Sequence, residues 1–322
     1  MKKTWRIVLP ALLVGSFISF ADTKDKREIN DKAVTEEICP CEMEGMDPEE
    51  AYNRSMANAG VSQQVSKETP KYLNPNIPIE ERIDDLLPRL TLEEKVIQLS
   101  DSWGSKGIAR LKIPAMLKTE GLHGQSYATG STIFPHGINM GSTFDTELIQ
   151  EVGKATAIEA KAANLRVSWS PVLDVARDAR WGRVEETYGE DPYLVGRIGV
   201  AWIKGFQGEH MFACPKHFAG HGQPVGGRDS HDYGLSDRVM RNIHLAPFRD
   251  VIKEANAFGV MAAYGLWNGV PDNGSKELLQ KILREEWGFE GFVVSDCSGP
   301  ENIQRKQSVV GTMEEAGCRY GC

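Results

Sequence analysis

From residue 78 onward, segments with apolar residues at helical spacing alternate with short runs of apolar, β-favouring residues. Thr91 and Glu94 form a capping-box pattern before one of these segments, and Asp191 with Pro192 has the pattern of an N-cap followed by a first-turn proline. The predicted helices span about 83–90, 92–99, 144–163, 191–206, 236–256 and 275–287, and the predicted strands about 113–117, 166–175, 212–218, 259–264 and 292–295.

This regular alternation of strands and helices predicts a parallel sheet, because each right-handed strand–helix–strand crossover returns the next strand beside the last one. Open doubly wound sheets share the same signature. However, no GxGxxG or Walker sequence opens any of the predicted helices. We therefore predict an α/β fold with a barrel rather than an open sheet.

The N-terminal segment has the layout of an export signal. Three basic residues precede an apolar run from Ile7 to Phe20, and small residues precede a possible cleavage site after Ala21. We expect residues 1–21 to be a signal peptide, with a retained lipid-embedded anchor as the alternative, and the mature protein to be secreted or periplasmic. Residues 22–77 are polar and aperiodic, so we interpret them as a linker or arm before a barrel domain at 78–322.

The composition is that of an ordinary globular protein, with 25% charged and 41% hydrophobic residues. A formal net charge of −8 gives no reason to expect a nucleic-acid partner, and we expect no membrane contact after signal removal. A neutral or weakly charged small substrate fits this balance better. No cofactor or metal is predicted, since Cys39 and Cys41 lack CxxC spacing and no second half of a zinc site follows them.

Asp296 is the first candidate for chemistry. It directly follows the apolar run 292–295, which suits a strand buried on both faces. Residues at the carboxyl ends of barrel strands face the substrate, and an ionised carboxylate there is costly unless it has a partner or a task. A helix N-cap is the structural alternative, since Asp is common just after a strand. The local pattern leaves both interpretations open.

Polar groups end the other predicted strands as well. Each has a structural explanation on its own, since a carboxylate can cap a turn and a tyrosine can be buried with a satisfied hydroxyl. Lys216 is harder to explain, because an ammonium after a buried strand requires a polar partner. Carboxylates accept hydrogen bonds from sugar hydroxyls and Lys or Arg donate to them, so together these groups suggest a site for a polyhydroxylated ligand. The set is Glu120, Asp174, Arg177, Lys216, His217, Tyr264 and Asp296.

Four motifs, in order along the chain, resemble those of glycoside hydrolase family 3. They are TEGLHG at 119–124, SPVLDVARDARWGRVEETYGED at 170–191, CPKHFAGHG at 214–222 and the segment from MAAYG to VVSD at 261–296. The resemblance extends over about 78–310. It implies a retaining enzyme that hydrolyses terminal non-reducing β-linked sugars, with a (β/α)8-like first domain followed by an α/β sandwich.

The resemblance implies roles for the residues that match the motifs. Asp296 corresponds to the nucleophile, and Lys216 with His217 to the pair that holds sugar hydroxyls. Glu120 takes the place of the acid that grips the hydroxyls at the non-reducing end.

The remaining matching positions border this site. Arg183 is implied to contact the sugar, so the motif favours it over Arg177, which becomes an expected partner of nearby acids. Tyr264 is implied to lie near the nucleophile. Arg228 and Asp229 are implied to edge the pocket.

The sequence departs from the family pattern at its end. The chain stops at Cys322, so we expect the second domain, from which the family draws its acid/base glutamate, to be absent. The ending at 309–322 also resembles a shortened form of a helix that continues further in the family, so we expect the (β/α)8-like TIM barrel to be incomplete at its C-terminal end. Because leaving-group protonation contributes about 10²–10⁴-fold, we expect impaired activity, and a non-catalytic sugar-binding remnant is the alternative function.

A metal-dependent hydrolase on the same barrel is a further alternative. Two histidines four residues apart suit helix-borne metal ligands, although Lys216 would place a positive charge beside the ion. The candidate ligands are His217, His221 and His231 with Asp229 or Asp232.

Two expectations concern the surroundings of Asp296. Many glucoside-cleaving relatives have Asp at the position of Glu120, and pentose-cleaving relatives resemble this chain in having Glu there and Cys at the position of Cys297, so β-xylosides are favoured over β-glucosides. Cys214 and Cys297 flank the Lys-His pair and the nucleophile candidate. We expect their side chains at the same end of the barrel, with a disulfide or two unrelated buried thiols as the alternatives.

Overall fold

The computed structural model describes residues 69–100, 104–126 and 129–320. The predicted signal peptide lies outside the described residues, as do Cys39 and Cys41. None of the helices within the described ranges combines the length and apolar character that crossing a bilayer requires.

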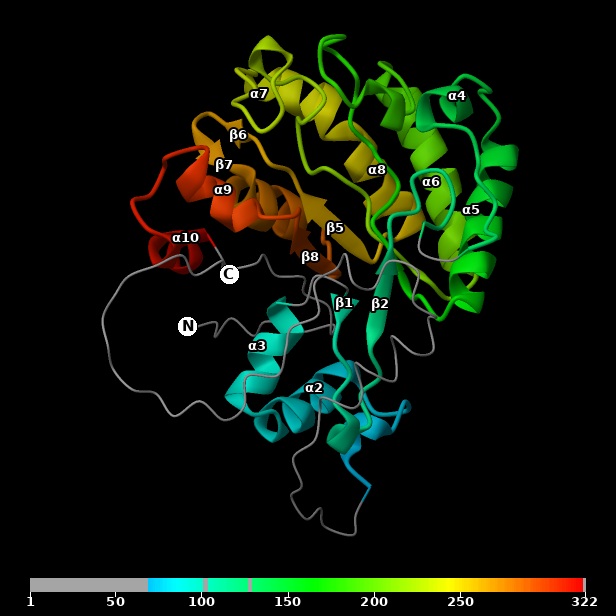
Figure 1. Cartoon of the computed structure of the whole chain (residues 1–322), viewed down its shortest axis with the longest axis vertical. Coiled ribbons are helices and arrows are strands. Elements are labelled where there is room, and N and C mark those ends of the chain that lie inside the picture. Colours follow the sequence, from blue (N-terminus) through cyan, green and yellow to red (C-terminus); the bar gives the residue numbers. More distant parts are fainter. Residues whose placement is uncertain (1–68, 101–103, 127–128, 321–322) are drawn as a thin grey trace.

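The described part of the chain is built around a wall of parallel strands with helices packed against it (Figure 1). In order along the wall these are β2 (Met116–Thr119), β3 (Val167–Ser168), β4 (Phe212–Ala213), β5 (Gly259–Ala262) and β8 (Phe292–Ser295). A bridge between Phe218 and Ala262 joins the first three strands to the last two. The carboxyl ends of all five strands therefore lie at the same edge of the wall.

Strand order identifies the wall as part of a barrel. Neighbouring strands follow each other in chain order from β2 to β8, whereas a doubly wound sheet reverses its order at a switch point. At the other end, β1 (Gly104–Ser105) pairs antiparallel with β2. Among the described residues β8 does not pair with β1, so the wall stays open. The prediction of an incomplete TIM-like barrel is confirmed.

The predicted helices form where their capping signals place them. The Thr91 hydroxyl accepts from the backbone N–H of Glu94 at 3.2 Å, and the Glu94 carboxylate accepts from the N–H of Thr91 at 2.8 Å. Asp191 accepts from the N–H of Leu194 at 2.8 Å. The helices are α2 (Ile79–Leu86), α3 (Leu92–Ser100), α4 (Gly137–Gly141), α5 (Thr146–Ala162), α6 (Pro192–Gly208), α7 (Asp237–Val239), α8 (Ala246–Ala255), the π-helical η7 (Met240–His244) and η9 (Lys276–Glu286), α9 (Gly299–Arg305) and α10 (Met313–Tyr320).

Short elements connect these helices and strands. A hairpin of β6 (Leu266–Trp267) and β7 (Val270–Pro271) follows β5. The 3-10 turns in the loops are η2 (Lys71–Leu73), η3 (Leu87–Arg89), η4 (Ala109–Leu111), η5 (Val184–Glu186), η6 (Val225–Gly227) and η8 (Asp272–Gly274).

Two apolar cores lie on opposite sides of the wall. The larger one contains Trp202 and Phe206 of α6 and Phe248 of α8, and it fills the space between the wall and the helices α5, α6 and α8, which pack side by side (Figure 1). The smaller one faces the barrel interior. Its members are Val167, Trp169, Cys214, Met261, Phe292 and Val294, with Met116 and Phe212 packed against them. Burial on both faces explains why the strands read as continuous apolar runs.

Four predicted strands differ from the observed ones. The predicted strand 259–264 ends at Ala262, and prolines lie at the other three differences. The predicted strands 166–175 and 212–218 each reduce to two residues of regular ladder, because Pro171 and Pro215 have no N–H to donate. Similarly, β2 begins at Met116, after Pro114, rather than at Ile113. Beyond these prolines only isolated parallel bridges remain, between Val172 and Lys216 and between Phe218 and Ala262.

The fold also begins earlier than the predicted boundary at residue 78. Tyr72 of η2 is buried in a small cluster with Leu90, Ile108 and Leu111. Its hydroxyl donates to the carbonyl of Leu111 at 2.8 Å. This contact attaches the end of the predicted arm to the domain.

Candidate active site

The edge of the wall brings most of the predicted residues together. Glu120 follows β2, Lys216 and His217 follow β4, Tyr264 follows β5 and Asp296 follows β8. Parallel strands end at the same edge, so residues far apart in the sequence become neighbours there. The structure orders them into a few hydrogen-bonded pairs.

Glu120 and Lys216 form an ion pair across the site. The Nζ of Lys216 lies 2.9 Å from Oε2 of Glu120, and the lysine side chain is 6% exposed against 32% for the glutamate. Burial alone would raise the pKa of Glu120, but the charge and hydrogen bond of Lys216 outweigh it and lower that pKa. Burial would likewise lower the pKa of Lys216, whereas the charges of Glu120 and Asp296 raise it. Both groups are therefore held in their charged forms.

His217 is fixed by a fully buried carboxylate. Its Nδ1 lies 2.7 Å from Oδ2 of Asp174, and its backbone N–H donates to the same oxygen at 3.3 Å. Burial, together with the charge of Arg183, lowers the pKa of His217. The imidazole is thus neutral, and the proton on Nδ1 faces Asp174.

Arg183 supplies the contact on the other side of this ring. Its Nη2 lies 2.9 Å from Nε2 of His217, and since a guanidinium only donates, that nitrogen accepts. The Nε and Nη2 of Arg183 also donate to the two carboxylate oxygens of Glu186, each at 2.8 Å. Burial would lower the pKa of Arg183, but the hydrogen bonds and charge of Glu186 raise it. The guanidinium is consequently charged and rigidly oriented.

Asp296 lies where these groups converge. Its Oδ1 accepts from the backbone N–H of Cys297 at 2.7 Å, and its Oδ2 lies 3.4 Å from Nε2 of His217. Burial raises the pKa of Tyr264, and the charge of Asp296 and a hydrogen bond with it add to this effect. The N-cap alternative for Asp296 is wrong, because α9 has Ser298 as its N-cap. The carboxylate is 13% exposed and can be reached from the site.

Asp229 stands at the border of the site. Its Oδ1 accepts from the indole N–H of Trp181 at 3.0 Å and lies 3.0 Å from Nε2 of His221. Burial would raise the pKa of Asp229, but its hydrogen bonds with His221 and Trp181 lower it. Arg228 is exposed beside Asp229 in the chain. That these two residues edge a substrate pocket stays a prediction.

Some residues of this network were not singled out from the sequence. Glu186 orients Arg183, and Trp181 orients Asp229. Both occur in the same RWGRVEE stretch as Arg183. Lys118 on β2 was also missed, although a lysine inside an apolar strand is a recognisable signal. The expectation that Arg177 pairs with nearby acids is wrong, since its side chain is exposed and forms no ion pair with any described acid.

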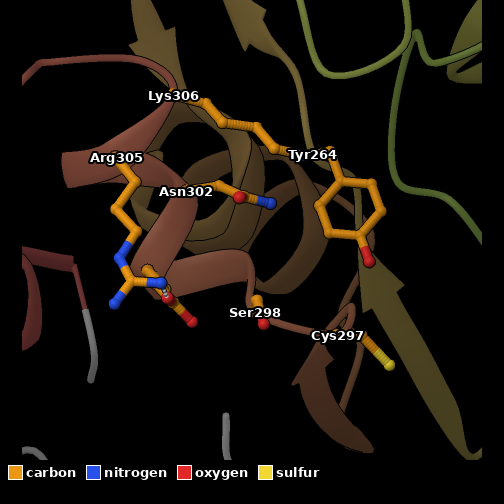
Figure 2. Close-up of a pocket in the computed structure, with 7 residues that line it drawn as sticks. Tyr264, Cys297, Ser298, Asn302, Arg305 and Lys306 are labelled. Atoms are coloured by element: carbon orange, nitrogen blue, oxygen red, sulfur yellow. Dashed lines mark ion pairs between the residues drawn. The ribbon is translucent and has the colours of Figure 1, made fainter. Parts of the chain in front are cut away.

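A cavity of about 370 Å³ opens where Tyr264 and Cys297 follow β5 and β8, and Asp296 is not among its lining residues. In Figure 2, Asn302 of α9 and its N-cap residue Ser298 lie near the Tyr264 ring and Cys297, which follow β5 and β8. An ion pair joins Arg305 to Glu301 on the cavity wall. The full lining is Tyr264, Cys297, Ser298, Glu301, Asn302, Arg305 and Lys306.

The two cysteines at the strand ends do not form a disulfide. Cys214 is a buried free thiol inside the barrel core, and Cys297 is an exposed free thiol. Burial raises the pKa of both thiols, so neither is a strong nucleophile. The thiols are therefore separate, but the prediction that both are buried is wrong for Cys297.

The metal-dependent alternative finds no support in the geometry. Arg183 lies 2.9 Å and 3.2 Å from the Nε2 atoms of His217 and His221, where a cation would have to bind. His231 is exposed. Within the described ranges no group of three or more His, Cys, Asp or Glu side chains is arranged to hold a metal ion.

The buried Asp174 gives the domain a distinctive pH dependence. Burial raises the pKa of Asp174 from 3.8 to about 7. Between about pH 4 and pH 7 the folded state holds a proton that the unfolded state releases, so the free energy of unfolding falls as pH rises through this window. The Asp174→Asn variant has no carboxyl group that titrates at this position. As pH rises through the window, its free energy of unfolding should increase relative to that of wild type by up to about 1.4 kcal/mol per pH unit.

Urea denaturation of both proteins between about pH 5 and pH 8 measures this difference. Asp178→Asn is the control, because the hydrogen bond from Arg180 lowers the pKa of Asp178 to about 2, outside the window. A difference between Asp174→Asn and wild type that stays constant across the window would contradict the assignment.

A barrel wall with a charged, hydrogen-bonded cluster at the carboxyl ends of its strands defines an α/β-barrel protein with a ligand site at this face. The sequence profile of the glycosyl hydrolase family 3 N terminal domain matches residues 91–319, and the chain belongs to this family.

Named relatives include enzymes for two sugars. The chain is 38% identical to a β-xylosidase of Formosa agariphila, over 76% of this chain and 35% of that protein. It is also 38% identical to a β-glucosidase of Rhizobium radiobacter, over 67% of this chain and 27% of that protein. The chain therefore spans about a third of the length of these relatives.

Solved structures show the same fold. A β-glucosidase from Erythrobacter marinus superposes with a TM-score of 0.63 at 39% identity, over 65% of this chain and 28% of that one. A β-glucosidase from Listeria innocua in complex with isofagomine superposes with a TM-score of 0.66 at 28% identity, over 74% of this chain and 39% of that one.

Proposed function

We propose that the protein is a retaining exo-β-glycosidase in which Asp296 is the nucleophile. The observation that carries this proposal is the position of the Asp296 carboxylate. It is held by the N–H of Cys297 at the end of β8 and lies 3.4 Å from His217, beside the Glu120–Lys216 pair. A sugar whose hydroxyls bind Glu120, Lys216 and Arg183 would present its anomeric carbon to this carboxylate.

The proposed reaction has two displacements. A carboxylate oxygen of Asp296 attacks the anomeric carbon, the bond from that carbon to the leaving oxygen breaks, and the leaving oxygen takes up a proton from solvent. Water then attacks the same carbon and loses a proton to solvent. The bond from the carbon to Asp296 breaks, which releases the sugar and the carboxylate. The buried Arg183 and Lys216 hold their hydrogen-bonding groups in place before the reaction, which favours a fixed sugar orientation.

An aryl glycoside with a dinitrophenol leaving group tests the first displacement alone, because such a leaving group needs little protonation. We expect a burst of dinitrophenol, stoichiometric with the protein, followed by slower release. A purely sugar-binding protein would show binding without any release of dinitrophenol.

We further propose that the site prefers β-xylosides to β-glucosides. Glu120 is longer by one methylene than Asp and, held by Lys216, it would take up space that a glucose hydroxymethyl group needs. A difference of one methylene is typically worth about 10–200-fold. Relatives of this chain bear both names, which is consistent with a small change setting the choice.

Glu120→Asp should therefore shift the ratio of kcat/KM for aryl xyloside over aryl glucoside towards glucoside by about 10-fold or more. Glu190→Asp removes the same methylene at an exposed position and should leave the ratio unchanged. A wild type that clearly prefers glucosides would refute the proposal.

We also propose that the protein is exported. The basic and apolar N-terminal pattern supports this proposal. A relative from Salmonella typhimurium, 33% identical over 69% of this chain, is named a periplasmic β-glucosidase.

A further inference from the structure

Lys118 is a buried cation that the proposed mechanism does not use. It lies on β2, and its side chain is 7% exposed. Side chains alternate along a strand, so Met116, Lys118 and Glu120 share one face. Met116 packs against the core inside the barrel and Glu120 lies in the site, which places Lys118 on the interior face between them.

The ammonium of Lys118 lies over an aromatic ring but has no hydrogen-bond acceptor among the described residues. Its Nζ lies 5.5 Å from the centroid of the buried Trp169 ring, a cation–π distance. No hydrogen bond or ion pair joins this ammonium to any other described residue. A buried ammonium without an acceptor is costly, so an acceptor from a ligand would satisfy it.

The charges that act on Lys118 are those of the site. Burial lowers the pKa of Lys118, while the charges of Glu120, Cys297 and Asp296 raise it. Lys118 precedes Glu120 by two residues on the same strand, which places it on the Glu120 side of the site rather than on the side of β8 and Asp296. Lys216 adds a second positive charge to this group.

We propose that Lys118 is a further substrate-binding residue, whose ammonium donates to a hydroxyl at the end of the sugar away from the anomeric carbon, the C4 hydroxyl of a xyloside. The inference rests on the proposed glycosidase function, in which Asp296 marks the anomeric carbon and Glu120 the opposite end. The two ammonium groups and two carboxylates cancel in formal charge. A neutral sugar therefore suits the site better than an acidic one.

Binding of aryl 1-thio-β-xyloside and its 4-deoxy analogue tests the proposal without requiring turnover. In wild type the 4-deoxy compound should bind about 10- to 100-fold more weakly, the range for a hydrogen bond to a charged group. Lys118→Met, which keeps the side-chain length, should bind the parent compound more weakly and abolish the difference between the two. Lys118→Gln should give the same result and serves if the Met variant does not fold.

The control is Lys154→Met, the same exchange at an exposed position of α5, which should keep the wild-type ratio. An undiminished preference for the 4-hydroxyl in the Lys118 variants would overturn this inference and leave the proposed function standing. A thioglucuronide that binds wild type more tightly than the thioxyloside, with the gain lost in Lys118→Met, would overturn the hydroxyl assignment. A wild type that binds none of these compounds would contradict both proposals.

Discussion

Asp296→Asn is expected to abolish covalent labelling by a 2-fluoroxylosyl fluoride and to reduce dinitrophenyl xyloside turnover by at least about 10⁴-fold, the scale on which loss of a catalytic nucleophile acts. The amide has the shape of the carboxylate but lacks the negative charge that attacks the anomeric carbon. Because Asp296 lies at the end of β8 and is partly exposed, the fold should survive the change. Mass spectrometry of the labelled wild type should locate the sugar on Asp296.

The control for this variant is Glu290→Gln, another change of carboxylate to amide, at an exposed position before β8. It should be labelled as wild type is. Label on a different carboxylate, or label that persists in Asp296→Asn, would exclude Asp296 as the nucleophile. Circular dichroism and thermal unfolding of each variant separate loss of chemistry from loss of fold.

Lys216→Met should destabilise the domain by about 3 kcal/mol, at the lower end of the range for breaking a buried ion pair. The variant leaves the carboxylate of Glu120 without the ammonium that lies 2.9 Å from it. The double variant with Glu120→Gln should recover part of the loss, because it removes the unpaired charge. Urea denaturation of the two single variants and the double variant measures the coupling.

Lys281→Met provides a matched control. Its ammonium also lies 2.9 Å from a carboxylate, that of Glu277, but the lysine is 61% exposed and the glutamate 41%. Water screens an exposed pair at i,i+4 spacing, so Lys281→Met should lose far less stability than Lys216→Met. Equal losses in the Lys216 and Lys281 variants would show that burial does not strengthen the site pair.

Features that depend on neighbours in the chain were determined by the sequence. The capping box of Thr91 and Glu94 and the N-cap Asp191 form as predicted, because each bond closes within three residues. The strand 292–295 has the predicted bounds, since Gly291 precedes it and Asp296 ends its apolar run. The order of strands and helices was also sufficient for the fold class, because right-handed crossovers leave few arrangements.

The tertiary structure alone decided which polar groups meet. Lys216 finds Glu120 across 96 residues, and the imidazole of His217 finds Asp174 across 43. No local sequence pattern encodes pairs that are so far apart along the chain, since these pairs follow from the alignment of parallel strands. For the same reason the sequence could list the strand-end residues as one set but could not assign their partners.

The tertiary structure also decided which side chains are buried and which way each one points. Arg183 became the contact to His217, Arg177 remained on the surface, and Lys118 was placed on the interior face of β2. Cys214 and Cys297 follow neighbouring regions of the wall but differ in depth, one inside the barrel core and one exposed. A sequence specifies the side-chain chemistry available at each position, whereas desolvation and hydrogen bonding depend on the groups that the packed chain brings within a few ångströms.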